Sequence, residues 1–591
     1  MLEKLISKKN LRFILIIGTI SFITLLLINF IVSNEHNTII RLFNSIDSAV
    51  ASFGGHHGDT LILLIEYSKT NILFRVALVA YLFASILAIF FSFCLVYDLF
   101  KLLYFKSREG TRMFNEDSYV IFGYNEEAIE LIENTEGINP KNIHIMSSSE
   151  FNLDQLKKIG GLGVSYDYFK KEELKDFLNR KRFNKVRNIL FCESKPMENF
   201  SLCKNLSSYL KENNNLNISL IPMNDAEDMA INNNCNELFI KSITKNVIIA
   251  QSIVKSVSTE ICENLEKYRS KDLKCLIVGF GKTGKDLFSL LINQLVIRSD
   301  NKISIDIVDT QASYALKNTI ENVCQEYKNS DGLYIAGNVS DGILEVNTFN
   351  CSYNDYKIHE KLMYDEYDFV IVNLSSEENY SNYIESNRLL INSLKDTTKF
   401  VVPVIKNNEY TRLIMDSFDN VIVSKVYEIF NLNLLQNNEI EDNAMKFNYN
   451  YHRINKELID DKYTLWRKSE WYNKKSARYQ SLHQNINIAL KQNYIGINED
   501  MCNLFKYIDN SEKVDEIINS NKMLKEFAMM EHRRWTYFVI LDGYKYNPEK
   551  NKKKKHSDCI MNWAMLREYK KTTLIFDIIP LMVLTKDEMG E

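Results

Sequence analysis

The sequence predicts an α/β fold, with a transmembrane helical hairpin at the N-terminus, two doubly wound parallel-sheet domains and a C-terminal all-α domain. Three observations carry this prediction. Two long apolar runs lie within the first hundred residues, short β-branched runs alternate with helical stretches from 113 to about 435, and helical spacing dominates after that. The 591 residues suffice for about four units of roughly 150 residues each.

Composition excludes several classes of protein. Hydrophobic residues make up 46% and charged residues 25% of the chain, with only 6 Pro and 19 Gly. The chain is therefore neither a disordered linker nor collagen-like. Lys and Arg number 72 against 76 Asp and Glu, which gives a net charge of -4. We expect no nucleic-acid partner, because this balance lacks the positive excess that bulk nucleic acid requires.

The first element is a membrane hairpin over residues 1–112, with helices at about 13–33 and 74–98. The run from Phe13 to Val32 contains no charged residue, and at 1.5 Å per residue it matches a hydrocarbon core of roughly 30 Å. A second run, Val76 to Val96, has the same character. No small-x-small cleavage site precedes Asn34, so we expect a retained helix rather than a signal peptide. The lipid bilayer is the expected partner of this hairpin.

Basic residues flank the two spans and predict their orientation. The loop between the spans holds few beyond Arg41 and Lys69. The flanking residues are Lys4, Lys8, Lys9, Arg12, Lys101, Lys106, Arg108 and Arg112. Both termini should therefore be cytoplasmic, in a two-span protein of the cell inner membrane. The 10 Cys show no CxxC pair or metal-ligand spacing, as expected for reduced thiols and no metal site.

The loop between the spans bears on a channel function. Ser52 to Gly58 shares only its glycine content with potassium selectivity filters. Thr38 to Phe53 fits either an amphipathic re-entrant or interfacial helix, or an ordinary extracytoplasmic helix followed by a glycine turn. No charged residue lies within the first span or in the middle of the second, so a pore through one chain alone is not expected.

A degenerate nucleotide-type domain is predicted over residues 113–260. A strand ends at Gly123, and a helix follows from Glu126. Asn125 and Ala128 stand where a dinucleotide loop needs its second and third glycines. Glu126 and Glu127 place negative charge where a phosphate would sit. Further strands are expected at Ile143–Met146, Asn188–Cys192 and Ile218–Met223. We expect a structural role for this domain.

The second domain, residues 261–435, carries a complete glycine motif. The strand Leu273–Val278 leads into Gly279-Phe280-Gly281-Lys282-Thr283-Gly284 and then a helix. The glycines suit a tight turn, close approach to a pyrophosphate, and helix–strand packing. Lys282 and Lys285 add positive charge, and the next strand ends in Asp309, which can accept from ribose hydroxyls. The alternative remains open that the glycines serve packing alone and that Asp309 caps the next helix.

Three more strands continue this domain, at Gly332–Gly337, Asp368–Asn373 and Lys399–Ile405. From Leu273 to about Val423 the order of elements resembles the RCK or Trk-type N (TrkA-N-like) domain of potassium-uptake regulators, with a weaker copy from Ser118. The resemblance implies paired Rossmann-like domains that sense NAD(H) or another adenine nucleotide beneath a membrane channel or transporter, in a homo-oligomer. The family has Gly-Asp after the third strand. Here Gly337-Asn338 stands there and Asp341, the last expected cofactor contact, comes later.

The C-terminal part divides into a polar helical bridging region, residues 436–500, and a module over residues 501–591. A helix from Met523 to Leu541 carries Glu531, His532, Arg534 and Trp535. Gly543-Tyr-Lys-Tyr546, His556-Ser-Asp558 and Asn562-Trp563 follow it.

These motifs resemble the ryanodine-receptor (RyR) domain over about Met523 to Leu584, although Asn562 replaces the usual Pro. The resemblance implies a small nucleotide-like ligand. Trp535 and Trp563 would stack a base and Arg534 and His532 would meet phosphate, with Glu531 and Tyr546 completing the site. The alternative is a helical domain in which Trp535 is core and Glu531–Arg534 is a structural ion pair.

Together these elements predict a membrane-anchored nucleotide-sensing regulator, such as a ligand-gated, potassium-type ion channel or a transport component. A tethered ligand-binding scaffold and an antiviral-defence effector are the alternatives. An NAD-dependent oxidoreductase is less favoured, because no catalytic pattern surrounds His359, the lone histidine between His144 and His452. No HExxH, GxSxG or Walker motif occurs. We therefore expect no enzymatic activity.

Overall fold

Two compact units make up the chain. The first comprises Met1–Tyr124 and Asn139–Val186, and the second comprises Asn125–Ile138 and Arg187–Glu591. A computed structural model describes residues 8–33, 35–111, 113–147, 162–165, 178, 182–195, 197–211, 217–222, 227, 230, 231, 234, 238, 240–242, 244–330, 332–374, 377–406, 415–435, 439–455, 461–495, 504–507 and 509–589.

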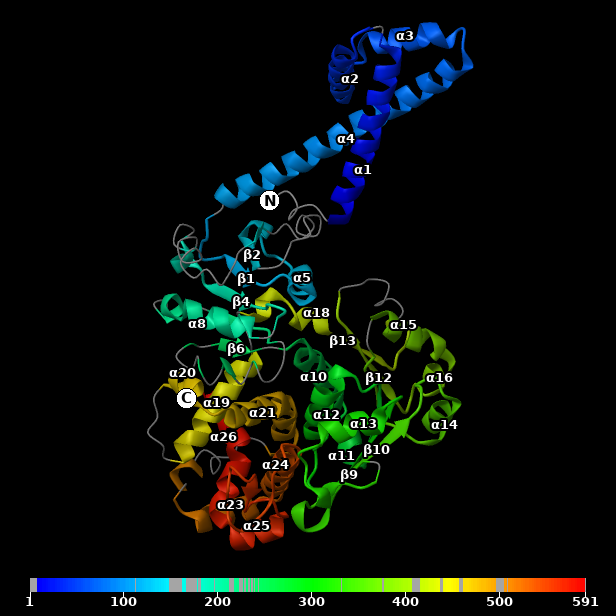
Figure 1. Cartoon of the computed structure of the whole chain (residues 1–591). Helices are drawn as coiled ribbons and strands as arrows, with labels where there is room; N and C mark the ends of the chain where they lie inside the picture. Colours follow the sequence, from blue (N-terminus) through cyan, green and yellow to red (C-terminus); the bar gives the residue numbers. More distant parts are fainter. Residues whose placement is uncertain are drawn as a thin grey trace. The chain divides into compact units, whose positions relative to one another are not determined.

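Four helices form the N-terminal part of the first unit: α1 (Lys8–Val32), α2 (Thr38–Phe53), α3 (Gly58–Ser68) and α4 (Ile72–Thr111). In Figure 1, α1 and α4 pack across each other and α2 and α3 lie at one end of the pair. Small and apolar residues fill the contacts, including Leu25, Ala49 and Ala88. Gly18 permits the α1–α4 approach, because a Cβ there would lie 2.6 Å from the Phe91 ring.

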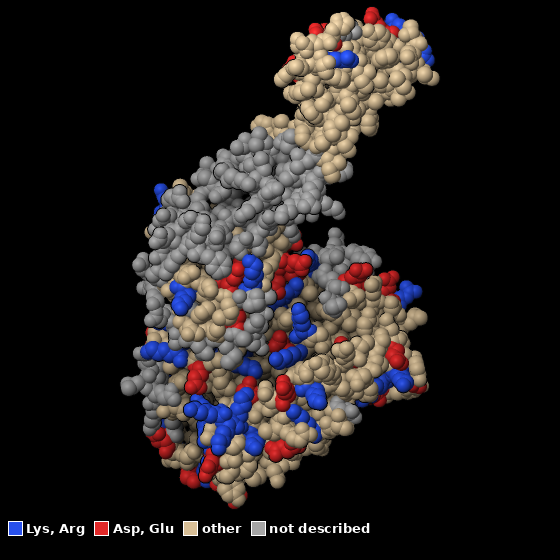
Figure 2. Space-filling model, in the orientation of Figure 1, with Lys and Arg blue, Asp and Glu red and all other residues tan. Residues whose placement is uncertain are grey.

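One helix in the described part of the chain, Ile72–Cys94 within α4, is long and apolar enough to cross a membrane. Only 22% of that segment is buried, whereas a core helix of a soluble protein would be mostly buried. The apolar stretch of α1, Ile16–Val32, is shorter. The structure therefore supports one membrane-crossing helix, and Lys4 and Arg112, two of the basic flanks used for the orientation, lie outside the described residues. Among the described side chains of α1 to α4, the charged ones drawn in Figure 2 lie near the end that carries α2 and α3.

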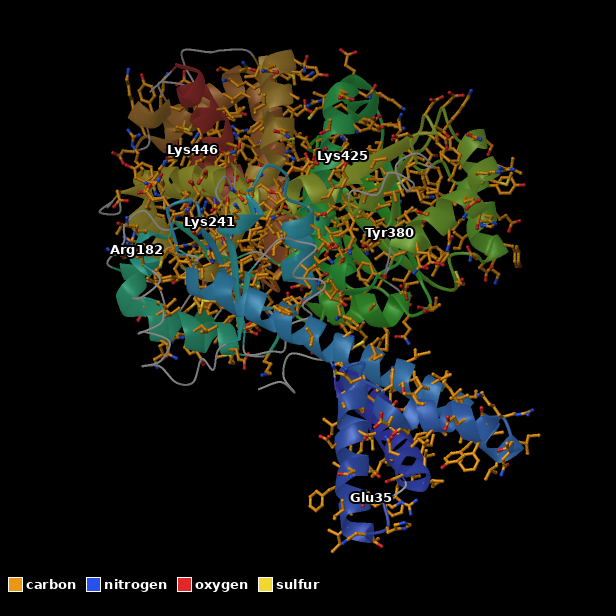
Figure 3. All side chains as sticks on the ribbon, turned by 90° about the horizontal axis from the view of Figure 1, so that it is seen from above. Glu35, Arg182, Lys241, Tyr380, Lys425 and Lys446 are labelled. Atoms are coloured by element: carbon orange, nitrogen blue, oxygen red, sulfur yellow. The ribbon has the colours of Figure 1, made fainter. Side chains whose placement is uncertain are left out.

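The segment Thr38–Phe53 is helical, as the sequence predicts, and its faces are arranged unusually. Its inward residues are small or polar, namely Ser45, Ala49 and Ser52. Six of its exposed residues are large and apolar, and Thr38, Asn44 and Asp47 are exposed with them. The six are Ile39, Ile40, Leu42, Phe43, Ile46 and Val50. An apolar outer face suits lipid contact better than water contact. Figure 3 shows Glu35 at the end where α1 is joined to α2, and the sequence did not predict α3 beyond that point.

Three parallel strands complete the first unit, in the order β3-β2-β1: β1 (Tyr119–Phe122), β2 (Ile143–Ser147) and β3 (Leu162–Ser165). In the second unit, β4 (Asn188–Phe191), β5 (Asn217–Leu220) and β6 (Ile240–Ser242) are also parallel neighbours. The predicted strands at 118–123, 143–146, 188–192 and 218–223 are confirmed as β1, β2, β4 and β5, although Met223 lies outside the described residues. The helices α5 (Glu126–Glu133), α8 (Glu198–Lys211) and α10 (Lys245–Glu263) also belong to the second unit.

A seven-stranded sheet forms the centre of the second unit. Its strands are β7 (Leu273–Val278), β8 (Lys302–Asp309), β9 (Leu333–Ile335), β10 (Ile343–Asn350), β11 (Phe369–Val372), β12 (Lys399–Val404) and β13 (Val421–Lys425). The order is β13-β12-β11-β7-β8-β10-β9, and all neighbours are parallel except β9 with β10. The six parallel strands thus follow the Rossmann order 3-2-1-4-5-6, which confirms the predicted doubly wound domain. Its helices are α11 (Leu265–Arg269), α12 (Lys282–Gln294), α13 (Ala312–Thr319), α14 (Tyr356–Tyr364), α15 (Glu377–Ser386), α16 (Arg388–Ser393) and α18 (Val426–Ile429).

One strand assignment was wrong. The run from Gly332 to Gly337 is not the third parallel strand but contains the short antiparallel edge strand β9. The third parallel strand is β10, which pairs with β8 from Ile343 opposite Lys302 to Asn350 opposite Asp309. Its sequence was missed because its buried and half-buried residues alternate, unlike the continuous apolar runs of β7 and β11.

The C-terminal part is mainly helical and packs on this sheet domain. Its helices are α19 (Glu439–Ile454), α20 (Lys462–Lys468), α21 (Trp471–Leu490), α23 (Ser511–Ser520), α24 (Lys522–Leu541), α25 (Trp563–Tyr569), the 3-10 segment η9 (Lys571–Ile578) and α26 (Ile579–Met589). A two-stranded ribbon, β14 (Lys545–Tyr546) with β15 (His556–Ser557), corrects the all-α expectation. Both α21 and α24 contact α12, as Figure 1 shows.

Candidate functional site

The glycine loop lies at the carboxyl edge of the sheet, between β7 and β11, where the strand order reverses. Gly279 has φ +89°, and a Cβ there would lie 2.3 Å from the Asn373 carbonyl oxygen after β11. The Asn373 side chain also donates to the Gly279 oxygen at 3.2 Å. Gly279 is therefore required by the fold itself.

The other two glycines differ from each other. A Cβ on Gly284 would lie 3.0 Å from the Phe280 ring, so this glycine serves packing. A Cβ on Gly281 would meet nothing within 4 Å. Gly281 is the N-cap residue of α12, and no side chain caps the helix there. No side chain at the N-cap position therefore competes for the first amides of α12, and uncapped helix N-termini of this kind can bind phosphate.

Asp309 lies beside this loop, as the sequence predicts. Its Oδ2 accepts from the Phe280 amide at 2.9 Å, and its Oδ1 accepts from the Gln311 amide at 2.9 Å and the Thr310 hydroxyl at 3.4 Å. The carboxylate therefore fixes both the loop and the start of the next segment. A carboxylate has about four acceptor positions, which leaves one for a ligand hydroxyl.

The remaining residues at the start of α12 are either exposed to solvent or hydrogen-bonded to α10. Lys282 and Lys285 are exposed. The Thr283 hydroxyl donates to Asn246 at 3.3 Å, which ties the loop to the start of α10. The two lysines thus place positive charge on the surface next to the glycine loop.

Helix α5 of the degenerate domain, unlike α12, has a side chain that caps its first amides. The Asn125 side chain accepts from the Ala128 amide at 2.8 Å and donates to the Cys192 oxygen at 2.6 Å. The start of α5 is therefore closed by its own side chain. Burial raises the pKa of Glu127, although Lys245 and Lys282 oppose that shift. An acid at this point disfavours an anionic ligand.

Asp341 is not part of the glycine-loop site. It precedes β10, at the amino edge of the sheet, opposite the edge that carries Asp309. Its carboxylate accepts from the Trp563 amide at 3.0 Å, and so helps to hold α25. The residue that ends the third parallel strand is Asn350, whose side chain bonds the Ser313 amide and hydroxyl at 2.9 and 2.7 Å. The sequence analysis could not name Asn350 as the residue at the end of the third parallel strand, because it did not predict β10.

In the C-terminal module, Glu531 and Arg534 form the ion pair of the structural alternative. Arg534 Nε and Nη2 donate to Glu531 Oε2 and Oε1 at 2.8 and 2.6 Å, and both side chains are about 1% exposed. Arg534 Nη1 also donates to Asn293 of α12 at 3.3 Å. All three nitrogens of the guanidinium thus donate within the protein, and Arg534 does not line the cavity described below.

His532 forms a second buried pair. Its Nε2 lies 2.8 Å from the Met561 oxygen and its Nδ1 3.3 Å from Asp577 Oδ2. Burial disfavours the imidazolium, but Asp577 and the Met561 carbonyl outweigh it, so the pKa of His532 is raised. Burial also raises the pKa of Asp577. Asp577 and the Met561 carbonyl therefore hold the imidazole through both of its ring nitrogens.

A cavity of about 350 Å³ lies between α19, α21, α24 and η9, a size typical of small-molecule sites. Three predicted residues line it, namely Glu531, His532 and Trp535. Tyr546 is exposed on β14, and Trp563 is buried against His532 with ring centroids 6.0 Å apart. Arg534, Tyr546 and Trp563 are not among the lining residues.

The bridging region supplies the part of the cavity that the sequence did not predict. From α21 come Tyr472, Asn473, Ser476, Ala477 and Gln480. Their spacing places them on one face of a helix, and this pattern can be seen in the sequence. The sequence does not show which other helices this face contacts, so it did not reveal the cavity. Tyr472 is hydrogen-bonded to Trp535 across the cavity wall. The cavity is therefore built jointly by the bridging helices and the C-terminal module.

Comparison with known proteins adds little to this description. No family model and no curated protein matches the chain. Among solved structures, a point mutant of GsuK aligns at 13% identity and TM-score 0.34, over 73% of this chain and all of that one. GsuK bound to ADP aligns at 13% and 0.33, over 72% of this chain and 98% of that one. A dipicolinate synthase chain from Bacillus halodurans aligns at 9% and 0.19, over 55% and 98%. At these TM-scores the fold assignment depends on strand order and loop geometry alone.

Proposed function

We propose that this chain is a membrane-anchored regulator whose second doubly wound sheet senses NAD(H) or another adenine nucleotide. One observation carries the proposal: Gly281 opens the uncapped start of α12 to a ligand, with Asp309 held beside it. The phosphates would lie on the first amides of α12, and the remaining acceptor position of Asp309 would take a ribose hydroxyl.

The membrane part of the proposal is a two-span hairpin of the inner membrane with both termini in the cytoplasm. The exposed apolar segment Ile72–Cys94 and the apolar outer face of α2 support a lipid environment. Nucleotide binding would alter the packing of the sheet domains in a homo-oligomer and so control ion flux, of potassium type, or a transport component.

The cavity supports a second ligand on the RyR-like module, as the resemblance implies. Trp535 and Tyr472 offer aromatic faces, and the carboxyl groups of Glu531 and Asp577 accept from ring amino groups. Lys550 and Lys552 also line the cavity and are exposed, where an anionic group would end. These features suit a small nucleotide-like molecule.

The glycine-loop site is tested by two matched variants of the purified full chain. Gly281→Asp and Gly281→Asn add side chains of nearly equal size into open space, so both should fold. Only the aspartate repels phosphate. We expect ADP, ATP or NAD to lose at least about tenfold more affinity in Gly281→Asp than in Gly281→Asn, by calorimetric titration. Equal affinities in the two variants would show that phosphate does not bind at this loop.

A further inference from the structure

Helix α12 extends from the glycine loop to the C-terminal module. Its first turn begins at Lys282, directly after Gly281 in the glycine loop. Its last turn contains Asn293, which is 0% exposed and lies against the C-terminal module. A displacement at either end is therefore transmitted along one rigid element of 13 residues.

A continuous set of hydrogen bonds runs from the cavity to the last turn of α12, and we call it the polar chain. It consists of Gln480, Glu531, Arg534 and Asn293. Gln480 Nε2 donates to Glu531 Oε1 at 3.2 Å, and the Glu531–Arg534 pair leads on to Asn293 Oδ1 at 3.3 Å. Asn293 in turn donates to the Ser289 oxygen of its own helix at 2.9 Å.

A second contact also joins α21, which lines the cavity, to the end of α12. His483 of α21 lies three residues beyond Gln480, and its Nε2 is 3.1 Å from the oxygen of Val296, just past the end of α12. Burial, with Arg534 nearby, lowers the pKa of His483 to about 4, so this imidazole is neutral and bonds the carbonyl as a donor. Helix α21 thus holds the end of α12 while its other residues line the cavity.

The polar chain responds to a ligand because its carboxylate has limited capacity. Glu531 Oε1 already accepts from both Gln480 and Arg534. A ligand amino group that bonds Glu531 would compete with Gln480 and shift the carboxylate. Arg534 is about 1% exposed, so leaving its charge unpaired is very costly and the guanidinium must follow Glu531. Asn293 then moves with the guanidinium.

We infer that the cavity and the glycine loop are energetically coupled, with the polar chain and α12 as the connection. Occupancy of the cavity changes the nucleotide affinity of the loop, and the loop nucleotide changes the affinity of the cavity by the same factor. This inference rests on the proposed function, since it needs a ligand at each site. Couplings of this kind are typically about 5- to 150-fold in affinity.

The test uses the full chain in lipid nanodiscs with ADP, ATP and NAD as probes. Trp535→Ala removes an aromatic wall of the cavity and leaves the loop, whereas Gly281→Asp blocks the loop and leaves the cavity. Binding to each variant gives the isotherm of one site. Coupling is measured as the difference between the wild-type isotherm and the sum of the two single-site isotherms. We expect the affinity of at least one site in the wild type to differ at least about fivefold from its value in the single-site variant.

The connection itself is tested at Asn293, which lies in neither site. Asn293→Leu removes the acceptor of Arg534 and should make the two sites independent, while Asn293→Asp keeps an acceptor and should retain the coupling. Asn387→Leu is the matched control: Asn387 is also buried and donates to the backbone oxygen four residues earlier, at 2.8 Å. It should leave the coupling unchanged.

The outcomes separate the two proposals. If no probe binds to Trp535→Ala, the loop is not a nucleotide site, and the proposed function and the coupling fall together. If the probes bind to Trp535→Ala but not to Gly281→Asp, the loop site stands, the cavity does not take these nucleotides, and the coupling is wrong. If both sites bind and the wild-type isotherm equals the sum, the sites stand and the coupling is wrong. Should Asn293→Leu fail to fold, hydrogen exchange of residues 289–294 in Gly281→Asp decides instead, since protection unchanged by the cavity probe would overturn the connection.

Discussion

Arg533 joins the C-terminal module to the sheet domain through hydrogen bonds. Replacing it with alanine should make the protein more tolerant of a methyl group at Gly342. The side chain is about 1% exposed. It makes five hydrogen bonds, two to Asn301, one each to the oxygens of Arg298 and Ile343, and one to the Tyr537 hydroxyl, at 2.6–3.2 Å. In the described part of the chain no carboxylate pairs with it, so backbone and side-chain oxygens alone stabilise the charge.

The magnitudes follow from these contacts. Arg533→Ala leaves several buried oxygens without a donor, at about 1–3 kcal/mol each where water cannot replace the bond, partly offset by removing a buried charge. We expect a net loss of about 3–5 kcal/mol. A Cβ at Gly342 would lie 2.4 Å from Arg533 Cζ, so Gly342→Ala displaces the guanidinium and should cost about 1–3 kcal/mol.

A double-mutant cycle isolates the interaction. Once Arg533→Ala has removed the guanidinium, Gly342→Ala should cost less than about 0.5 kcal/mol. Hydrogen exchange of α24 and β10 amides is the suitable assay, because a chain of several units does not unfold in one step. Additive costs, with Gly342→Ala equally damaging in both backgrounds, would refute this packing argument.

Two further predictions concern the glycine loop and the buried histidine. Gly279→Ala should destabilise the second sheet domain by more than about 2 kcal/mol, because it strains φ +89° and brings a Cβ to 2.3 Å from Asn373 O; hydrogen exchange of β7 and β11 checks this, and wild-type protection would contradict it. The pKa of His532 is raised above 6.5, so its contribution to stability is full below pH 6.5 and falls as pH rises through the folded pKa. The raised pKa of Asp577 acts in the same direction. The protection of α24 amides against hydrogen exchange, measured in wild type and His532→Gln between pH 5.5 and 8.5, should therefore become equal at high pH, and a constant difference would contradict the assignment.

Local patterns predicted the geometry of the glycine loop. The strand β7, the three glycines and the start of α12 are adjacent in the sequence, and Asp309 ends the next strand, so local signals suffice. The error at Asp341 has a physical origin. An antiparallel edge strand, β9, imitates a third parallel strand, and it reverses which edge of the sheet the following residues occupy.

The cavity was beyond sequence reasoning for a different reason. Its walls come from α19, α21, α24 and η9, which are separated by long stretches of chain, and only tertiary packing brings Gln480 to Glu531. The motif around Trp535 was found, but its charges pair inward: Arg534 bonds Glu531 and Asn293 instead of facing a ligand. Local spacing shows which residues share a helix face and does not show what covers that face.

Ion flux through liposomes that contain the purified full chain tests the central proposal most directly. Potassium flux should change when ADP, ATP or NAD is added to the side that carries the sheet domains, and the response should persist in Gly281→Asn but disappear in Gly281→Asp. Flux that is the same with and without every nucleotide, in the wild type as in both variants, would contradict a nucleotide-controlled membrane function.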